Sequence, residues 1–144
     1  MRSDAGPWSS REFLSAYISG YADGEGCFTV SIAPRAKLLA GWEVRPSFSV
    51  SQNGDRAEVL HALAAYFGCG SIRPDRSDRT LKWETRRLED LLERVIPHFE
   101  VYPLLSGKRL DFETVRNCLP ADGRWRAPHA RNRAWSRSSS SLAV

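Results

Sequence analysis

Residues 18–28 have the sequence Ile18-Ser19-Gly20-Tyr21-Ala22-Asp23-Gly24-Glu25-Gly26-Cys27-Phe28. An apolar stripe runs into this segment, because Leu14, Tyr17, Ile18 and Tyr21 recur at the i, i+3, i+4 and i+7 positions of one helical face. The stripe predicts a helix over Arg11–Ala22 that the glycines at 24 and 26 end. Glu25 is therefore expected just past the end of that helix, where the chain turns into a strand.

Alternating polar and apolar residues follow in two runs, Gly26–Ala33 and Trp42–Gln52. Period two with β-branched and aromatic residues is typical of half-buried strands, so we expect an antiparallel hairpin joined by the loop 34–41. Ser71–Asp75 and Arg79–Arg86 are shorter strand candidates on either side of a polar turn.

Apolar stripes predict three further helices. The first begins at a pair that resembles a capping box, Asp55 and Glu58, and is closed by the glycines at 68 and 70. The second follows the stripe of residues 88–99, and Pro97 near its end is consistent with termination. The last begins at Ser106 and is expected to bury Phe112, Val115 and Leu119.

The order of these elements, α-β-β-α-β-β-α-α, predicts an α+β fold in which helices cover one face of an antiparallel four-stranded sheet. A chain of 144 residues suits one compact domain. We expect a flexible lead-in over residues 1–9, a folded domain over 10–119 and a basic tail rich in Arg, Ser and Trp over 120–144.

The net charge of +4 is concentrated in the tail. Residues 121–144 hold five Arg against one Asp, whereas residues 1–120 balance at sixteen basic and sixteen acidic groups. If the folded part binds nucleic acid, its charges must therefore be segregated by face. The tail could serve as a phosphate clamp or be an accidental basic extension of the reading frame.

The three cysteines at 27, 69 and 118 are scattered and share no metal-ligand spacing with the histidines. This pattern favours reduced thiols over a zinc site. No run approaches the roughly 20 apolar residues that a membrane span needs, and no apolar signal core follows the N-terminus. We expect an intracellular protein, in the cytoplasm, nucleoid or organelle matrix, that is neither secreted nor bound to a membrane.

One side of the predicted sheet carries short hydroxyls and arginines and has no apolar partner. Such a face meets water or a polar ligand, and we expect it to bind a polyanion. Its members by strand parity are Thr29, Ser31, Arg45, Ser47, Ser49, Ser51, Ser71 and Arg73. The basic side chains of Arg35 and Lys82 are two further candidates for contact with DNA. The alternative is that these residues form only the hydrated side of a sheet.

The helix, the Asp-Gly-Glu-Gly segment and the strand that follows it resemble the signature of the LAGLIDADG homing endonucleases. The resemblance continues through residues 48–52, 96–99 and 102–104 to Lys108, and covers roughly residues 11–119. It implies an αββαββα fold whose sheet forms a DNA-binding saddle. It also implies site-specific cleavage of double-stranded DNA at a long pseudo-palindromic target.

A ridge of minimal side chains repeats every four residues on the first helix, at Ala16, Gly20 and Gly24. Two such helices can approach closely, so we expect a homodimer with this ridge at its interface. Twofold pairing would bring two copies of Glu25 together, and like charges in one site require neutralising cations.

The resemblance places the family's metal-binding carboxylate on Glu25 and an auxiliary carbonyl ligand on Gly24. It implies Mg²⁺ as the cofactor, with Mn²⁺ or Ca²⁺ able to replace it in binding, and no small-molecule cofactor. Gln52 and Lys108 match the positions of residues that organise the attacking water, with Arg109 as a rival to Lys108. Asp23 matches an acid that is mainly structural in the family.

Other interpretations stay open. Glu25 alone could be a solvated carboxylate, Gln52 could be a turn residue before Asn53-Gly54, and Lys108 could pair directly with phosphate. The same scaffold could also serve as an intron RNA maturase, as a DNA-binding protein that does not cleave, or as a degenerate remnant that folds but is inert.

Overall fold

An antiparallel sheet of four strands in the order β1-β2-β4-β3 organises the computed structural model, which describes residues 10–39, 41–75 and 79–119. The predicted lead-in and tail lie outside the described residues. The strands are β1 (Gly26–Pro34), β2 (Trp42–Asn53), β3 (Ser71–Pro74) and β4 (Thr80–Thr85). The helices are α1 (Arg11–Glu25), α2 (Glu58–Phe67), α3 (Leu88–Asp90), α4 (Ile96–Val101) and α5 (Lys108–Cys118). Two short turns complete the order, η2 (Gly54–Arg56) and η3 (Leu91–Val95).

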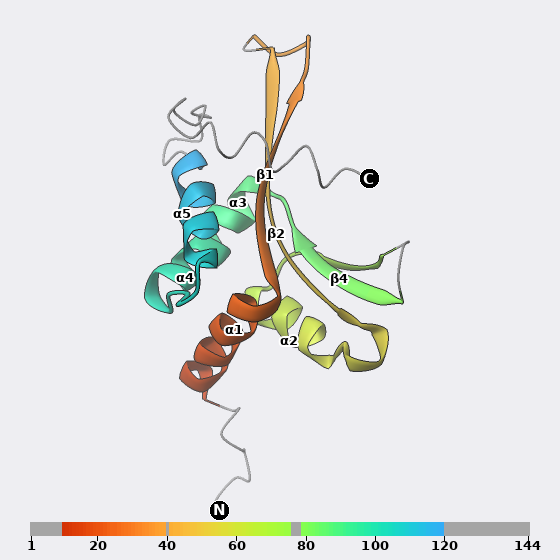
Figure 1. The fold of residues 1–144 in the computed structure, drawn as a ribbon, viewed down its shortest axis with the longest axis vertical. Helices are drawn as coiled ribbons and strands as arrows, with labels where there is room; N and C mark the ends of the chain where they lie inside the picture. The colour runs from red at the N-terminus through yellow and green to blue at the C-terminus, as the bar shows by residue number, and fades with distance from the viewer. Residues whose placement is uncertain (1–9, 40, 76–78, 120–144) are drawn as a thin grey trace, which may run out of the picture.

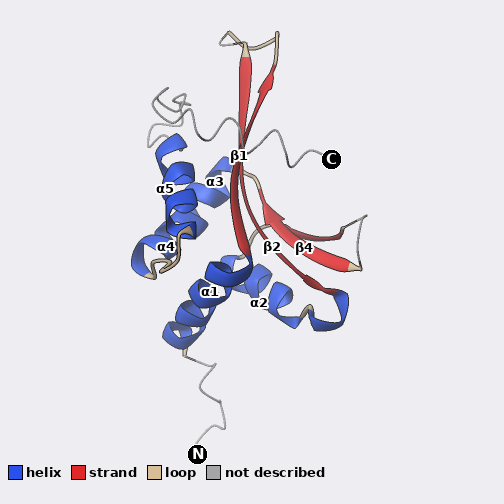
Figure 2. Ribbon diagram, in the orientation of Figure 1, coloured by secondary structure: helices blue, strands red, loops and turns tan. Residues whose placement is uncertain are grey.

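All the helices lie on one face of the sheet, so the predicted α+β architecture is confirmed (Figures 1 and 2). The edge strand β1 and its neighbour β2 project beyond the helical layer as a long hairpin (Figure 1). Among the described residues, no helix combines the length and apolar character that a membrane crossing requires.

Aromatic rings fill the space between the sheet and the helices. Phe28 and Phe48 are register partners and stack with ring centroids 4.4 Å apart. Phe99 from α4 meets each of them edge-on at 5.3 Å, and Trp83 meets Phe48 at 5.6 Å. Each of these side chains is at most 4% exposed, and burying one contributes about 1.5–3 kcal/mol. This core holds the end of α1 against the start of β1.

Helix α1 is longer than the sequence predicted. It continues through Gly24 to Glu25, and the N–H of Gly26 still bonds to the carbonyl of Ala22. The chain then becomes extended at Gly26, where a Cβ would lie only 2.6 Å from that carbonyl oxygen. Glycine at 26 therefore permits the sharp exit from the helix. The prediction that Glu25 lies beyond the helix is wrong, because Glu25 is its last residue.

Two other boundary predictions are wrong. Asp55 belongs to the turn η2, and α2 starts after Ala57 with no side-chain cap, so there is no capping box. Pro97 lies in the first turn of α4, and the helix continues to Val101. The π-helical turn η3 precedes it, and such a wider turn accommodates a residue that lacks an N–H. The predicted closing of α2 at Gly68 is confirmed by its left-handed φ of 64°.

Candidate active site and nucleic-acid interface

The C-terminal end of α1 brings together residues that are far apart in sequence. The Nζ of Lys108, at the start of α5, donates a hydrogen bond of 3.2 Å to the carbonyl oxygen of Gly24. Glu25 is exposed, and its carboxylate has no hydrogen bond or ion pair within residues 10–39, 41–75 and 79–119. A carboxylate, a carbonyl and an ammonium group thus gather at the junction of α1, β1 and α5.

Asp23 fastens the loop before α5 to the end of α1. Its carboxylate accepts the N–H of Leu105 at 3.0 Å, the N–H of Ser106 at 3.1 Å and the Ser106 hydroxyl at 2.5 Å. The Ser106 hydroxyl is the main cause that lowers the pKa of Asp23, assisted by the two backbone N–H groups and the charge of Lys108, against a smaller effect of burial. Asp23 stays ionised and its acceptor sites are occupied, which fits the expected structural role.

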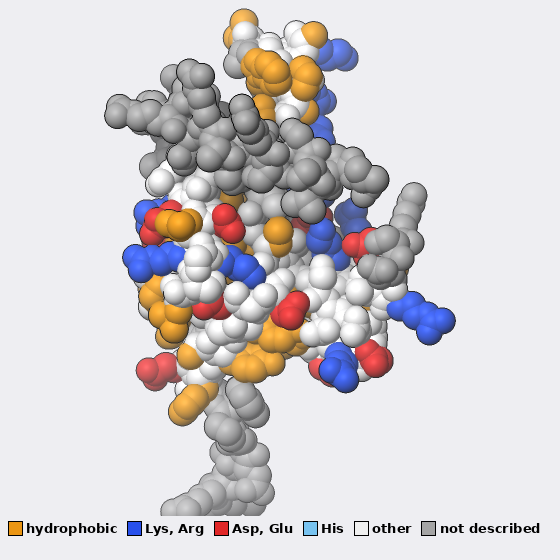
Figure 3. Space-filling model, viewed as in Figure 1, with side chains coloured by type: hydrophobic (Ala, Val, Ile, Leu, Met, Phe, Trp, Pro, Cys, Tyr) orange, Lys and Arg blue, Asp and Glu red, His pale blue; other side chains and the backbone are white. Residues whose placement is uncertain are grey.

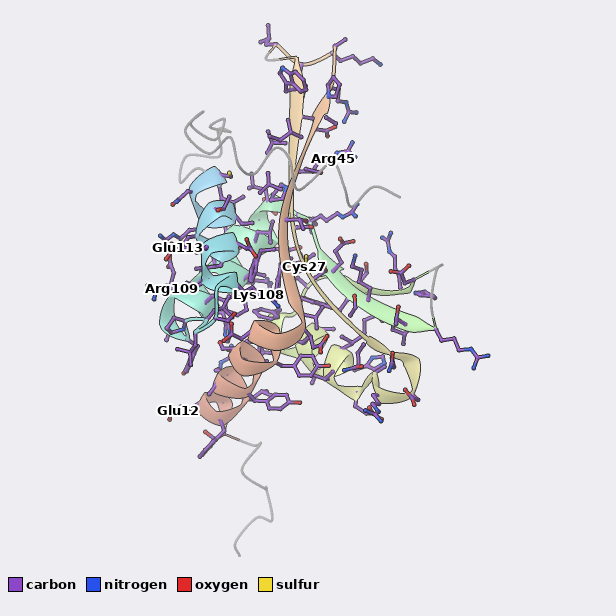
Figure 4. All side chains as sticks on the ribbon, viewed as in Figure 1. Glu12, Cys27, Arg45, Lys108, Arg109 and Glu113 are labelled. Carbon is purple, nitrogen blue, oxygen red and sulfur yellow. The ribbon has the colours of Figure 1, made fainter. Side chains whose placement is uncertain are left out.

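Lys108 and Arg109 point in different directions. Figure 4 shows Lys108 between α5 and β1, whereas Arg109 and Glu113 lie on the outer side of α5. Arg109 pairs with Glu113 one turn later, at 3.2 Å. Of these two cations, only Lys108 is therefore placed beside Gly24.

Gln52 lies on the helix side of β2, in phase with Phe48 and Val50. Its Nε2 donates to the hydroxyl of Tyr21 on α1, and its Oε1 accepts the N–H of Asn53 at 2.8 Å. The Gln52 side chain thus connects α1 to the turn that follows β2. No hydrogen bond joins Gln52 to Gly24, Glu25 or Lys108 in the described part of the chain.

One copy of the described chain holds no group of three or more His, Cys, Asp or Glu that could bind a metal ion. The end of α1 nevertheless presents two oxygen donors, the free carboxylate of Glu25 and the carbonyl of Gly24. An oxygen-only set of this kind suits Mg²⁺, which keeps several waters and takes only one or two protein ligands.

The strand register places the predicted polar residues on one side of the sheet. Thr29 pairs with Ser47, Ser31 with Arg45, Ser51 and Arg73 both with Lys82, and Ser49 and Ser71 both with Glu84. Ser47 and Ser49 are only 8% and 4% exposed. The Ser47 hydroxyl is also 2.6 Å from that of Thr29. The expectation that these two serines face solvent is wrong.

A carboxylate holds the two arginines of the hairpin. Glu43 accepts from Arg35 at 2.6 Å and from Arg45 at 2.8 Å. These bonds, that of Arg45 first, lower the pKa of Glu43. Alternation along the strands places Cys27, Glu43 and Glu84 on this side as well, but sequence reasoning chose only cations and hydroxyls as candidate binding residues.

The predicted ridge on α1 faces solvent. Ala16, Gly20 and Gly24 are all exposed, and a Cβ built at either glycine would meet no heavy atom within 4 Å. Two aromatic residues on the same helix, Phe13 and Tyr17, are 60% and 41% exposed. The glycines are therefore not required by packing within one chain.

Comparison with known proteins decides the family. The model of the LAGLIDADG endonuclease family matches residues 18–119, which include the Asp-Gly-Glu-Gly segment, the sheet and α5. The chain belongs to the LAGLIDADG endonuclease family. The resemblance inferred from residues 18–28 is thereby confirmed.

Relatives within the LAGLIDADG family share both sequence and fold. The homing endonuclease I-ApeII of Aeropyrum pernix is 36% identical over 107 residues, covering 74% of this chain and 62% of that protein. The crystal structure of the homing endonuclease I-TnaI is 33% identical with a TM-score of 0.68, and covers 73% of this chain and 70% of that one. The structure of I-LtrWI bound to target DNA is 32% identical with a TM-score of 0.72, covering 75% of this chain and 37% of that one. The chain spans less than two-thirds of the length of the curated relatives that it matches.

Proposed function

We propose that this chain is one subunit of a homodimeric, divalent-metal-dependent homing endonuclease that cuts double-stranded DNA at a long pseudo-palindromic target. The observation that carries the proposal is the group at the end of α1: a free Glu25 carboxylate, the Gly24 carbonyl and the Lys108 ammonium. These residues adjoin both an exposed ridge of small residues and the polar side of the sheet.

The exposed ridge supports a dimer. One described chain contributes a single free acid at this place, and cutting both strands requires two such acids. Pairing the Ala16, Gly20 and Gly24 ridges of two copies would set the helix ends side by side, with one Glu25 from each. Each sheet would then face one half of a twofold-symmetric site.

Glu25 and Gly24 would hold Mg²⁺, for which Mn²⁺ or Ca²⁺ could substitute in binding. The bound metal supplies charge neutralisation at the scissile phosphate and activation of water. Glu25 would be free to bind, because no group in the described part of the chain pairs with its carboxylate. Asp23 would not be a ligand, since its oxygens hold the loop of Leu105 and Ser106.

Lys108 and Gln52 would act on the polar groups around the reaction. The ammonium of Lys108 can neutralise developing negative charge on phosphate or orient a water molecule. Gln52 is positioned by Tyr21, so its amide would orient water at the edge of the site. Gln52 also accepts the N–H of Asn53 before the turn, and this turn role would be compatible with the proposed catalytic one.

The polar side of the sheet would contact DNA. Arg35, Arg45, Arg73 and Lys82 offer cations for phosphates or base edges. The exposed hydroxyls of Thr29, Ser31 and Ser71 and the half-buried hydroxyl of Ser51 can hydrogen-bond to bases directly or through water. Ser47 and Ser49 would shape the surface without reaching DNA.

An RNA maturase or a DNA-binding protein without nuclease activity remains the alternative on the same fold. The retained Glu25, exposed and unpaired, disfavours both, because binding alone does not need it. A plasmid library of random inserts, incubated with the purified chain and Mg²⁺, tests the proposal. We expect a recurrent cleaved sequence with approximate twofold symmetry, whereas uncut DNA with tight binding of intron RNA would refute the nuclease function.

Glu25→Gln provides the matched test of the site. The neutral amide keeps the shape of the side chain, so we expect cleavage to fall by about a hundredfold or more while DNA binding persists. Glu89→Gln removes an exposed acid on α3 and is the control. Equal cleavage by Glu25→Gln and the parent would rule out the proposed metal ligand.

A further inference from the structure

The outer half of the β1–β2 hairpin carries an apolar side that no described residue covers. Register partners lie on the same side of a sheet, so the pairs Ile32–Val44 and Pro34–Trp42 continue the side that holds Phe28 and Phe48. Ile32 is 46% exposed and Trp42 is 57% exposed. With Leu38 and Leu39 at the tip, these residues form what we call the hairpin strip: Ile32, Pro34, Leu38, Leu39, Trp42 and Val44.

The hairpin strip is separate from the polar side of the sheet. Ser31, Glu43 and Arg45 alternate with it on the same two strands and point the opposite way. Figure 3 shows the apolar side chains gathered on the projecting end of the hairpin. Contiguous apolar surface of this kind marks a place where another segment packs.

The chain itself supplies a candidate for that segment. After Leu119 it continues for the 25 residues Pro120–Val144, which contain Trp125, Trp135, Leu142 and Val144. The same residues carry five Arg against one Asp. Two tryptophans in so polar a segment need an apolar surface to be buried.

This segment starts close to the hairpin strip. Helix α5 packs along β1, and the ring of Phe112 lies 5.5 Å from that of Phe28. In Figure 1 the C-terminal end of α5 points toward the outer half of the hairpin. Leu119 lies about 10 Å beyond Phe112 at about 1.5 Å per helical residue, and Ile32 lies about 13 Å beyond Phe28 at about 3.3 Å per strand residue. The buried Leu119 is thus level with the start of the strip.

Chain length makes the tail a reachable occupant. An extended chain spans about 3.3 Å per residue, so Trp125 can reach about 20 Å from Leu119. The tail arginines beside the strip can extend into solvent. A second copy on the strip would instead join two chains, which the mixed isotopes of the experiment below distinguish.

We propose that residues 120–144 fold back onto the hairpin strip of the same chain, with a tryptophan packed between Ile32 and Trp42. The tail arginines then lie along the edge of the hairpin and add positive charge to it. This docking is independent of nuclease activity and of metal.

Photo-crosslinking tests the docking in the full chain without DNA. The photoreactive p-benzoylphenylalanine replaces Ile32 in one variant and Ser31, its neighbour on the polar side, in a matched control. An equal mixture of ¹⁴N- and ¹⁵N-labelled protein separates crosslinks within one chain from crosslinks between two. We expect Ile32 to crosslink to peptides from 120–144 within one chain, several-fold more than Ser31, and Trp125→Ala with Trp135→Ala to reduce this yield.

Hydrogen exchange gives a second readout that needs no probe at the strip. Amides of residues 36–44 are expected to exchange faster in the double tryptophan variant than in the parent, while those of α2 stay unchanged. Crosslinks from Ile32 that join mixed isotopes, equal yields from Ile32 and Ser31, or unchanged exchange in 36–44 would each overturn the proposal.

Discussion

The Asp23 carboxylate accepts both the backbone N–H and the hydroxyl of Ser106, at 3.1 and 2.5 Å, across 83 positions of sequence. This pair connects the end of α1 to the loop that leads into α5. Because Lys108 is two residues after Ser106, the position of its ammonium beside Gly24 depends on the same connection.

Ser106→Ala and Asp23→Asn should therefore be coupled. Loss of the hydroxyl bond should lower the free energy of unfolding by about 1 kcal/mol, since the pair is exposed. The cleavage rate should fall by a larger factor than this loss of stability alone would cause, because the ammonium of Lys108 loses its fixed position. Urea unfolding of the two single variants and the double variant measures the coupling. Strictly additive effects on both stability and cleavage would contradict the connection.

Asp23 also has a pH signature. Its pKa is lower in the folded chain than in the unfolded chain, so its contribution to stability is complete above the unfolded value of 3.8 and is lost as pH falls through the folded value. Unfolding free energies measured below pH 4 should fall more steeply in the parent than in Asp23→Asn. Equal pH dependence of the two free energies of unfolding would show that the pKa of Asp23 does not change on folding.

Gly20→Leu separates assembly from folding. A Cβ at this exposed helical position meets no neighbour, so the monomer should keep or slightly raise its stability, by up to about 1 kcal/mol. In a dimer built on the α1 ridge the leucine would keep the helices apart. Light scattering after size-exclusion chromatography should show a monomer, while Ala65→Leu, an exposed change on α2, should leave a dimer. A Gly20→Leu dimer would exclude this interface.

His98 predicts a loss of stability in mild acid. Its ring is 7% exposed, and burial, with the charge of Arg11 as a smaller cause, lowers its pKa to about 4. As pH falls, the unfolded chain takes up this proton first. His98 therefore does not reduce the free energy of unfolding above the unfolded pKa of 6.5, and reduces it as pH falls from 6.5 to about 4. The loss amounts to about 3 kcal/mol over that range. Urea unfolding at successive pH values measures this, and the free energy of unfolding of His98→Gln should fall less steeply with decreasing pH than that of the parent.

The hydrogen bonds of His98 also fix its tautomer. Ser19 donates its one proton to the carbonyl of Tyr102 at 2.7 Å, so it must accept from the Nε2 of His98 at 3.0 Å. The Nδ1 of the neutral ring then carries no proton and lies 2.8 Å from the Tyr66 hydroxyl, which is also 2.6 Å from the Ser15 hydroxyl and has one proton for the two contacts. Nitrogen NMR at neutral pH should show the proton on Nε2. A proton on Nδ1 would contradict this arrangement.

Glu43→Gln should strengthen non-specific DNA binding. The change releases Arg35 and Arg45 from their shared carboxylate and leaves both to pair with phosphates. We expect affinity for unrelated duplex DNA to rise several-fold, with a steeper dependence on salt. Glu89→Gln removes the same charge and an Arg87 ion pair from α3 and is the control. An equal rise in affinity in both variants would show that the effect comes from the change in net charge and not from the release of the two arginines.

Hydrophobic periodicity predicted the helices and strands, because the spacing of apolar residues follows from which side of each element is buried. The alternation from Gly26 placed β1 and β2 in the observed antiparallel pairing, and the stripe ending at Leu119 placed α5. The end of α1 was missed because helix-breaking by Gly24 is only a propensity, which continued hydrogen bonding overrides. The helix over residues 88–99 was predicted, but its continuation past Pro97 to Val101 was not, because the π turn before it leaves no mark in local spacing.

The candidate site was predictable only where a motif fixed it. Glu25, Gly24 and Lys108 followed from the family resemblance, and the structure brings the last two into contact. The loop held by Asp23 and the pairing of Gln52 with Tyr21 are long-range contacts that no sequence spacing contains. The burial of Ser47 and Ser49 was missed because strand parity assigns a side of the sheet and not an exposed fraction.

The exposed ridge of α1 and the polar side of the hairpin have no residue in common, since one lies on Ala16, Gly20 and Gly24 and the other begins at Cys27. Recognition and association can therefore change independently. In the proposed dimer, two copies of this chain with different hairpins but identical ridges would assemble as readily as identical copies, and together would address an asymmetric target. The same separation gives a natural route from a symmetric enzyme to a fused one, in which duplicated halves diverge in what they recognise while their shared seam is kept.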